Sequence, residues 1–230
     1  MKDNSMTHGF RIKRSWTRIG ADMVAAFRDL PVANVSDSMS RLAAFGPELR
    51  PMHRSGVLAG PALTVRSRPG DNLMLHKAID MAEPGDVIVL DAGGDMTNSL
   101  MGELMLAHAI RRGVAGFVLH GAIRDAEAIR ERNLPVYGCG ITHRGPYRTG
   151  PGEIGLPISL GGSVIRPGDL ILGDYDGLVA VPQDEAETIL AAARKKHAAE
   201  TRQMAETEAG TLDRAWVDKA LEAAGCVWLD

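Results

Sequence analysis

The sequence has few cysteines and few aromatic residues, and both shortages exclude classes of protein. Only two cysteines occur among 230 residues, Cys139 and Cys226, and they show no Cys-x-x-Cys or Cys/His zinc spacing. A disulfide framework is therefore not expected, and the thiols should be reduced. Aromatic residues make up 4% of the chain, too few for the stacking platforms that bind single-stranded nucleic acid.

The chain also lacks long apolar runs and a strong excess of charge. No run approaches the ~20 apolar residues of a membrane span, and the N-terminus has no apolar signal-peptide core. The formal net charge is −3, and the basic cluster at 11–14 is better explained as a solvated N-terminal arm than as a nucleic-acid patch. We expect a cytoplasmic protein that binds neither nucleic acid nor membrane.

Several catalytic motifs are absent as well. The sequence contains no Gly-x-Ser-x-Gly hydrolase elbow, no phosphate loop of the Gly-x4-Gly-Lys-Ser/Thr kind, and no Gly-x-Gly-x-x-Gly after a strand. Lys77 is the only lysine between positions 14 and 194. Because it falls in an expected helix rather than on a core strand, Schiff-base aldolase chemistry is disfavoured.

Apolar residues make up 45% of the chain, enough for one sizeable core. Periodicity and turn residues predict a β-α-β-α-β order over 84–138, which is typical of a largely parallel sheet covered by helices. The Gly- and Pro-rich segment 142–155 is expected to be a long loop. Helices are expected over 16–29, 37–42, 72–82, 99–112, 125–132, 184–208 and 215–223, and strands over 58–66, 87–91, 114–120, 136–138, 158–159, 163–165, 170–172 and 178–181.

The most informative segment is 113–125, Gly-Val-Ala-Gly-Phe-Val-Leu-His-Gly-Ala-Ile-Arg-Asp. An apolar strand ends there and delivers Arg124 and Asp125 where α/β proteins tend to place ligands. Arg124 offers a fork for an anion, and Asp125 offers a hard oxygen ligand for a cation, a pair that suits a small carboxylic acid beside Mg²⁺. The alternative is structural, with Asp125 capping a helix and Arg124 in a surface salt bridge.

Glu103 precedes Arg124 with twenty residues between them, and Gly102 stands before the acid. This acid-x20-Arg-Asp spacing resembles the RraA-like family, which includes divalent-metal class II aldolases for 4-hydroxy-4-methyl-2-oxoglutarate and 4-carboxy-4-hydroxy-2-oxoadipate. The resemblance covers most of the chain and implies an α/β fold, a swivelling β/β/α sandwich with a C-terminal helical extension. It extends to 84–91, 92–95, 167–169, 173–177 and 181–182.

The resemblance implies roles at the strand end. Asp125 would be the one protein carboxylate on Mg²⁺ (or Mn²⁺). Arg124 would contact the pyruvyl part of the substrate, where its guanidinium can stabilise negative charge on the 2-oxo oxygen. Glu103 would hold a metal-bound water, or it is simply a first-turn acid that stabilises its own helix.

The resemblance also implies a carboxylate-binding element next to Gly102. The backbone N–H groups of Leu104 and Met105 would bind the substrate carboxylate, at an expected helix N-terminus that favours anions. His120 could act as a base, but a structural histidine at a strand end is the commoner case. Capping explains Asp71 or Asn72 without a function.

The expected organisation is an α/β core with an N-terminal helix over 1–183 and a helical extension over 184–230. The extension should pack on a neighbouring subunit, because its long helix becomes polar and the tail 226–229 is apolar. The resemblance implies a homotrimer, or a hexamer made of two trimers, with Glu200 reaching the neighbour's site. A solvated surface charge is the alternative for Glu200.

The predicted function is a divalent-metal-dependent lyase that cleaves 4-hydroxy-2-oxo (di)carboxylic acids to release pyruvate. Oxaloacetate decarboxylation would be a side activity, because it needs the same electron sink. The alternative is a non-catalytic regulator that binds ribonuclease E. Such regulators lack the Asp after the Arg, so Asp125 favours the enzyme. The sequence leaves open which 2-oxo acid is the substrate.

Overall fold

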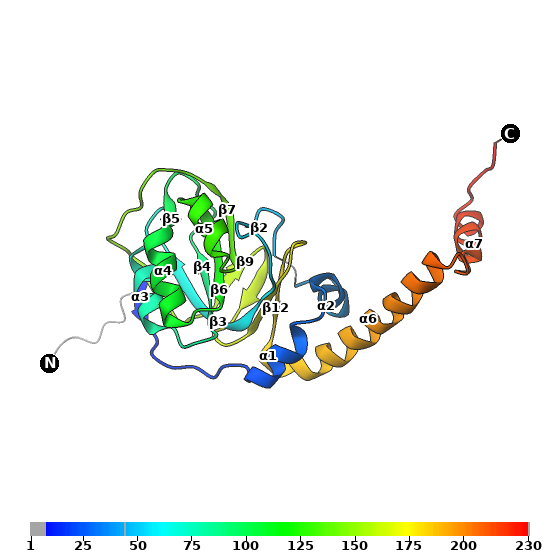
Figure 1. The fold of residues 1–230 in the computed structure, drawn as a ribbon, viewed down its shortest axis with the longest axis horizontal. Helices are drawn as coiled ribbons and strands as arrows, with labels where there is room; N and C mark the ends of the chain where they lie inside the picture. Colours follow the sequence, from blue (N-terminus) through cyan, green and yellow to red (C-terminus); the bar gives the residue numbers. More distant parts are fainter. Residues whose placement is uncertain (1–7, 44, 230) are drawn as a thin grey trace.

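A mixed ten-stranded sheet forms the centre of the molecule (Figure 1). The computed structural model describes residues 8–43 and 45–229. Leu63 lies opposite Ile88, Ile88 opposite Phe117, and Phe117 opposite Val136. This parallel block therefore confirms the β-α-β-α-β prediction. Its strands are β3 (Leu58–Ser67), β4 (Val87–Asp91), β6 (Gly116–Ile123) and β7 (Val136–Ile141).

Shorter strands extend the block. The first half of β3 pairs antiparallel with β11, and its end pairs antiparallel with β8. A separate two-stranded sheet is formed by β9 and β10. The short strands are β1 (Phe10–Ile12), β2 (Arg50–Pro51), β5 (Ser99–Met101), β8 (Gly152–Ile154), β9 (Ile158–Leu160), β10 (Ser163–Ile165), β11 (Leu170–Gly173) and β12 (Leu178–Val181).

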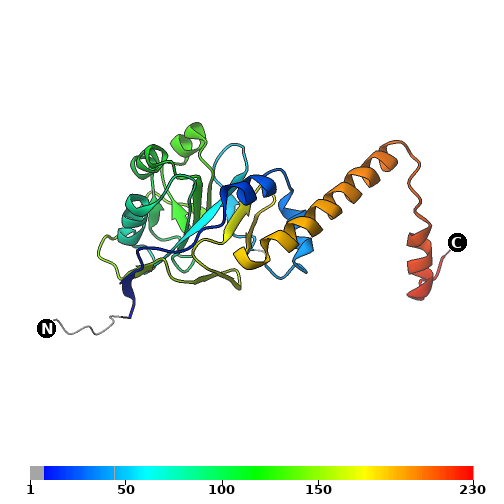
Figure 2. The same ribbon diagram turned by 90° about the horizontal axis from the view of Figure 1, so that it is seen from below.

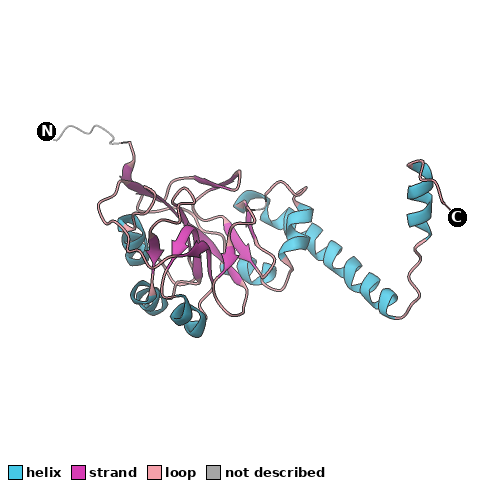
Figure 3. Ribbon diagram, turned by 90° about the horizontal axis from the view of Figure 1, so that it is seen from above, coloured by secondary structure: helices cyan, strands magenta, loops and turns pink. Residues whose placement is uncertain are grey.

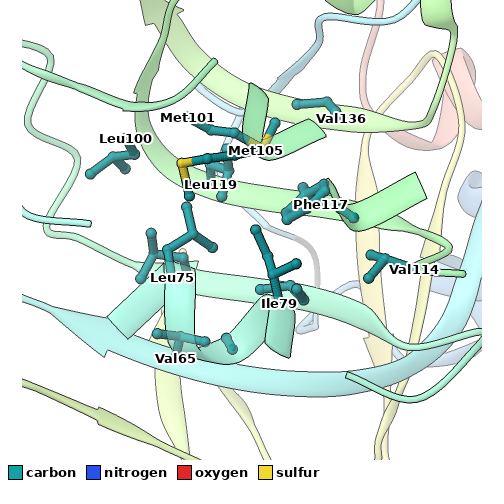
Figure 4. Packing of buried hydrophobic residues seen from close by; sticks show 14 of the residues in the cluster. Val65, Leu75, Ile79, Leu100, Met101, Met105, Val114, Phe117, Leu119 and Val136 are labelled. Carbon is teal, nitrogen blue, oxygen red and sulfur yellow. The ribbon is translucent and has the colours of Figure 1, made fainter. Parts of the chain in front are cut away.

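The two faces of the sheet carry different layers. On β4, Ile88 and Leu90 face a cluster with helical residues such as Leu75 and Ile79, while Val87 and Val89 face β9 to β12. Figure 4 shows Leu75 and Ile79 packed near Phe117 and Leu119. The order helix layer, sheet, second β layer is the expected β/β/α sandwich. The helix layer contains α3 (Leu73–Met81), α4 (Glu103–Arg112) and α5 (Ala126–Arg132).

A second group of helices covers β11 and β12. The helices α1 (Ala21–Phe27) and α2 (Val32–Ser38) pack there with the start of α6 (Ala186–Glu208). A 3-10 turn, η1 (Gln183–Glu185), leads into α6. All the buried residues of α6 lie in its first third, at Ala186, Ile189, Leu190 and Ala193.

Lys196 and Glu200 still contact α2. Beyond them α6 leaves the body of the molecule and carries α7 (Ala215–Ala223) at its far end (Figures 2 and 3). Trp216 and Trp228 are each 66% exposed, and Leu229 is 91% exposed. The expected helical extension is therefore present. Both cysteines are free. None of the helices within the described ranges is long and apolar enough to cross a membrane.

Several expected boundaries were wrong, including the ends of β6 and β7, which were expected at 120 and 138. Residues 99–101 are strand β5 rather than helix, because they pair with the end of β6. The first helix covers 21–27, not 16–29, and the second covers 32–38, not 37–42. The second helix cannot continue to residue 42, because Ser40 and Arg41 have φ of 58° and 61°, outside the range of a right-handed helix. The expected loop 142–155 ends in strand β8.

Candidate active site

The start of α4 lies next to the carboxyl-terminal end of the central strand β6. The Arg124 backbone N–H donates to the Met101 carbonyl over 2.9 Å, which ties the strand end to β5. Gly102 has an extended backbone, with φ −142° and ψ −170°. A Cβ at this position would collide with Asp125 Oδ2 and would crowd Arg124. Glycine therefore permits the close approach of this turn to the Arg-Asp pair.

Asp125 caps the neighbouring helix and not its own. It lies at the start of α5 with φ 53°, a left-handed conformation that Asp tolerates, and makes no side-chain bond to that helix. Its Oδ2 instead accepts the backbone N–H of Glu103 over 2.9 Å, and Arg124 Nε lies 3.8 Å from the same oxygen. The structural alternative therefore holds in part: Asp125 caps a helix and Arg124 lies in an exposed ion pair, but the capped helix is α4 and not the one that Asp125 begins.

Glu103 is held by α5. Its Oε1 accepts hydrogen bonds from Arg132 Nη2 at 2.8 Å and Nε at 3.2 Å. The carboxylate is therefore a first-turn acid of α4 in an ion pair, as the structural alternative predicted. Its role toward a metal-bound water stays a prediction.

A pocket of about 240 Å³ opens at this junction. Four of the residues predicted for the site line it: Gly102, Leu104, Met105 and Arg124. The backbone N–H groups of Leu104 and Met105 donate to no partner in the described part of the chain, as expected for the first turn of a helix. An anion in the pocket can therefore use them. The remaining lining residues are Asn72, His76, Ser99, Leu100, Met101, Pro146 and Arg148.

Four polar residues of this lining were not predicted as site residues, namely Asn72, His76, Ser99 and Arg148. Asn72 Nδ2 donates to the Leu100 carbonyl over 2.9 Å, and Asn72 makes no side-chain cap for α3. Of the two residues expected to cap this helix, Asp71 does so, because its Oδ1 accepts the Leu73 N–H, and Asn72 does not. The i, i+4 spacing of Asn72 and His76 was the available sequence signal. Arg148 enters from the distant loop 142–151.

His76 is kept neutral by its surroundings. Burial lowers its pKa below the usual value, and the positive charge of Arg148 lowers it further. Asp80 acts in the opposite direction, and His108 adds a small lowering. At neutral pH the imidazole therefore carries one N–H donor and no charge.

The loop 142–151 is fastened over the pocket by Asp71. Its fully buried carboxylate accepts the backbone N–H groups of Thr149 and Gly150 over 2.8 and 2.9 Å, besides that of Leu73. Burial alone would raise the pKa of Asp71, but these hydrogen bonds together lower it. The Tyr147 N–H also donates to the Gly70 carbonyl over 2.8 Å. These contacts hold Pro146 and Arg148 against the pocket.

The lining does not include four other predicted residues, Glu103, Asp125, Glu200 and His120. Glu200 Oε2 accepts Asn34 Nδ2 at 2.5 Å, and its Oε1 lies 3.0 Å from Lys196 Nζ. The hydrogen bond from Asn34 is the main cause that lowers the pKa of Glu200. His120 lies 3.5 Å from Asp91 and 3.9 Å from Glu48, so within one chain neither Glu200 nor His120 joins Arg124.

The donor set suits one kind of metal. No group of three or more His, Cys, Asp or Glu side chains placed to hold a metal occurs within 8–43 and 45–229. Zn²⁺ takes three or four protein ligands and does not fit. Mg²⁺ keeps several waters and uses one or two carboxylates, and Asp125, with a side chain 44% exposed, is chemically suited to it.

The fold and site thus define a β/β/α protein with a cationic, anion-accepting pocket at a strand end. A family model described as RraA-like, Aldolase/RraA, matches residues 32–180. A protein of Halalkalibacterium halodurans named "Putative 4-hydroxy-4-methyl-2-oxoglutarate aldolase" is 41% identical over 201 residues, 87% of this chain and 96% of that protein. This chain belongs to the RraA-like family.

Solved structures agree with this membership. An uncharacterised protein of Pseudomonas syringae has a TM-score of 0.77 and 25% identity, over 86% of this chain and 97% of that one. Streptomyces coelicolor RraAS2, described as an unusual member of the RNase ES inhibitor RraA protein family, has a TM-score of 0.74 and 27% identity, over 81% of this chain and 98% of that one.

Proposed function

We propose that this chain is a metal-dependent lyase that cleaves 4-hydroxy-2-oxo acids and releases pyruvate. The observation that carries the proposal is the convergence of three features at the junction of β6 and α4. These are the Arg124 guanidinium, the Asp125 carboxylate beside it and the unused N–H groups of Leu104 and Met105. The similarity to a relative named as an aldolase supports the same chemistry.

The chain's own groups account for binding and charge stabilisation. The N–H groups at the start of α4 bind the carboxylate of the 2-oxo acid. Cleavage breaks the C3–C4 bond: the 4-hydroxyl loses its proton, C4 becomes a carbonyl, and the electron pair moves toward the 2-oxo oxygen. Arg124 stabilises the negative charge there until C3 is protonated to give pyruvate. A divalent cation held by Asp125 would act as a Lewis acid at the same oxygen.

Oxaloacetate decarboxylation follows from the same arrangement. Loss of CO₂ from C4 of oxaloacetate leaves the same electron pair at C3, and the same groups stabilise it. We propose this as a side activity, with Mg²⁺ or Mn²⁺ as the cation. The site itself requires no organic cofactor for either reaction, because both use only an electron sink.

We also propose that the active form is a homotrimer or a pair of trimers. The exposed apolar residues of the extension need a partner surface, and closed symmetry is the usual form of such contacts. Residues 184–230 would then pack on a neighbouring subunit, where Glu200 could complete the site. The exposed apolar side chains in the extension are Met204, Trp216, Leu221, Val227, Trp228 and Leu229.

The test is pyruvate release from a panel of 4-hydroxy-2-oxo acids and oxaloacetate, measured with lactate dehydrogenase and NADH. We expect release with Mg²⁺ or Mn²⁺ and a dependence on Arg124. If no acid yields pyruvate while the protein binds ribonuclease E, the regulator is the better description.

A further inference from the structure

Two buried polar atoms of the pocket have no hydrogen-bond partner in the described chain. They are Asn72 Oδ1 and His76 Nε2. Asn72 is only 1% exposed, and its amide orientation follows from the bond that Nδ2 donates to the Leu100 carbonyl. Because a buried polar atom without a partner is costly, such atoms in a pocket indicate groups that a ligand satisfies.

The pocket has an excess of positive charge. Arg124 and Arg148 both line it, whereas its lining contains no Asp or Glu among the residues the structure describes. One arginine suffices for the pyruvyl end of a 2-oxo acid. The second comes from another part of the chain, on the loop that Asp71 holds in place. This second cation is unused by the reaction proposed above.

His76 and Arg148 act on the same part of the pocket. Both line it, and the positive charge of Arg148 helps to lower the pKa of His76. In the tautomer that carries the proton on Nε2, a neutral imidazole beside a guanidinium is a donor pair suited to a carboxylate. Asn72 Oδ1 can only accept, so it suits a hydroxyl rather than a carboxylate. A ligand with both groups would satisfy the two buried atoms together.

We propose that His76 and Arg148 bind the second carboxylate of a dicarboxylic 2-oxo acid, so that the pocket selects diacids over monoacids. This inference rests on the proposed function, which assigns the first carboxylate to the N-terminus of α4. Both residues line the pocket, but neither is needed at the 2-oxo group. His76 and Arg148 therefore determine which acid binds and take no part in the cleavage.

The test is a binding experiment with two uncleavable acids of equal chain length. 2-Oxoglutarate and 2-oxopentanoate differ only in a carboxylate that replaces a methyl group. Isothermal titration calorimetry in Mg²⁺ should show the wild type binding 2-oxoglutarate at least ~10-fold more tightly, since one charge-assisted hydrogen bond accounts for that ratio. Arg148→Gln should bring the ratio of the two Kd values close to one.

Matched variants separate recognition from general charge and folding. Arg144→Gln removes an exposed arginine of the same loop, outside the pocket lining, and should keep the wild-type ratio. His76→Gln keeps an N–H donor and should retain part of the preference, whereas His76→Leu should lose it. Thermal melts and circular dichroism check that each variant folds.

The outcomes distinguish this proposal from the proposed function. Three results would overturn the diacid subsite. The Arg148→Gln variant could keep the wild-type preference, or the wild-type protein could bind both acids equally or bind neither. Pyruvate release would then still support the lyase. Conversely, an Arg148-dependent preference for 2-oxoglutarate without pyruvate release from any acid would keep the subsite and reject the lyase.

Discussion

Replacing Arg124 by lysine should abolish most of the activity while leaving the fold intact. The backbone bond from the Arg124 N–H to Met101 does not depend on the side chain. The side chain is 39% exposed, and its contact with Asp125 is 3.8 Å long. Such an exposed pair contributes about 0–1 kcal/mol to the free energy of unfolding. The melting temperature should therefore shift by only a few degrees.

The effect on turnover should be much larger. Lysine keeps one positive charge but loses the planar fork, and removing one transition-state charge stabiliser costs ~2.7–4 kcal/mol. We expect kcat for pyruvate release to fall on the order of 10²-fold. Arg130→Lys on α5, an exposed arginine outside the pocket, is the matched control. Wild-type kinetics in a folded Arg124→Lys protein would refute the assigned role of Arg124.

Three further predictions concern the metal, the assembly and the loop. Excess chelator should abolish pyruvate release, and Mg²⁺ or Mn²⁺ should restore it; full activity in chelator would exclude a role for Asp125 as a metal ligand. Mixing inactive Arg124→Ala and Glu200→Ala subunits should restore some activity, because some composite sites carry neither change; no recovery despite confirmed subunit exchange would remove Glu200 from the site. Asp71→Asn should lower the free energy of unfolding by about 1–3 kcal/mol at neutral pH. Because the folded-state pKa of Asp71 is lowered, its contribution is present above the unfolded pKa of ~3.9 and is lost as the pH falls through the folded value. Chemical denaturation of both proteins from pH 7 to 3 should show the difference shrinking; a constant difference would contradict this origin.

The sequence by itself determined the elements with strong local periodicity. The apolar run Val87–Leu90 is bounded by a Pro-Gly-Asp turn and is strand β4, as predicted. The helix Ala215–Ala223 has the predicted bounds. The sequence also places Arg124 and Asp125 at a strand end, because the pair directly follows the apolar segment that forms β6 (Gly116–Ile123). Gly102, Leu104 and Met105 then followed from the resemblance and do line the pocket with Arg124.

Only the tertiary structure decided the rest of the site. Ser99–Met101 is a strand because it pairs with β6, and three residues carry too little periodicity to show this. Asp125 caps a helix that begins 22 residues earlier. His76 and Arg148 are 72 positions apart, and they share a pocket because Asp71 fastens the loop 142–151 to the start of α3. Such contacts depend on long-range packing, which local sequence patterns do not record.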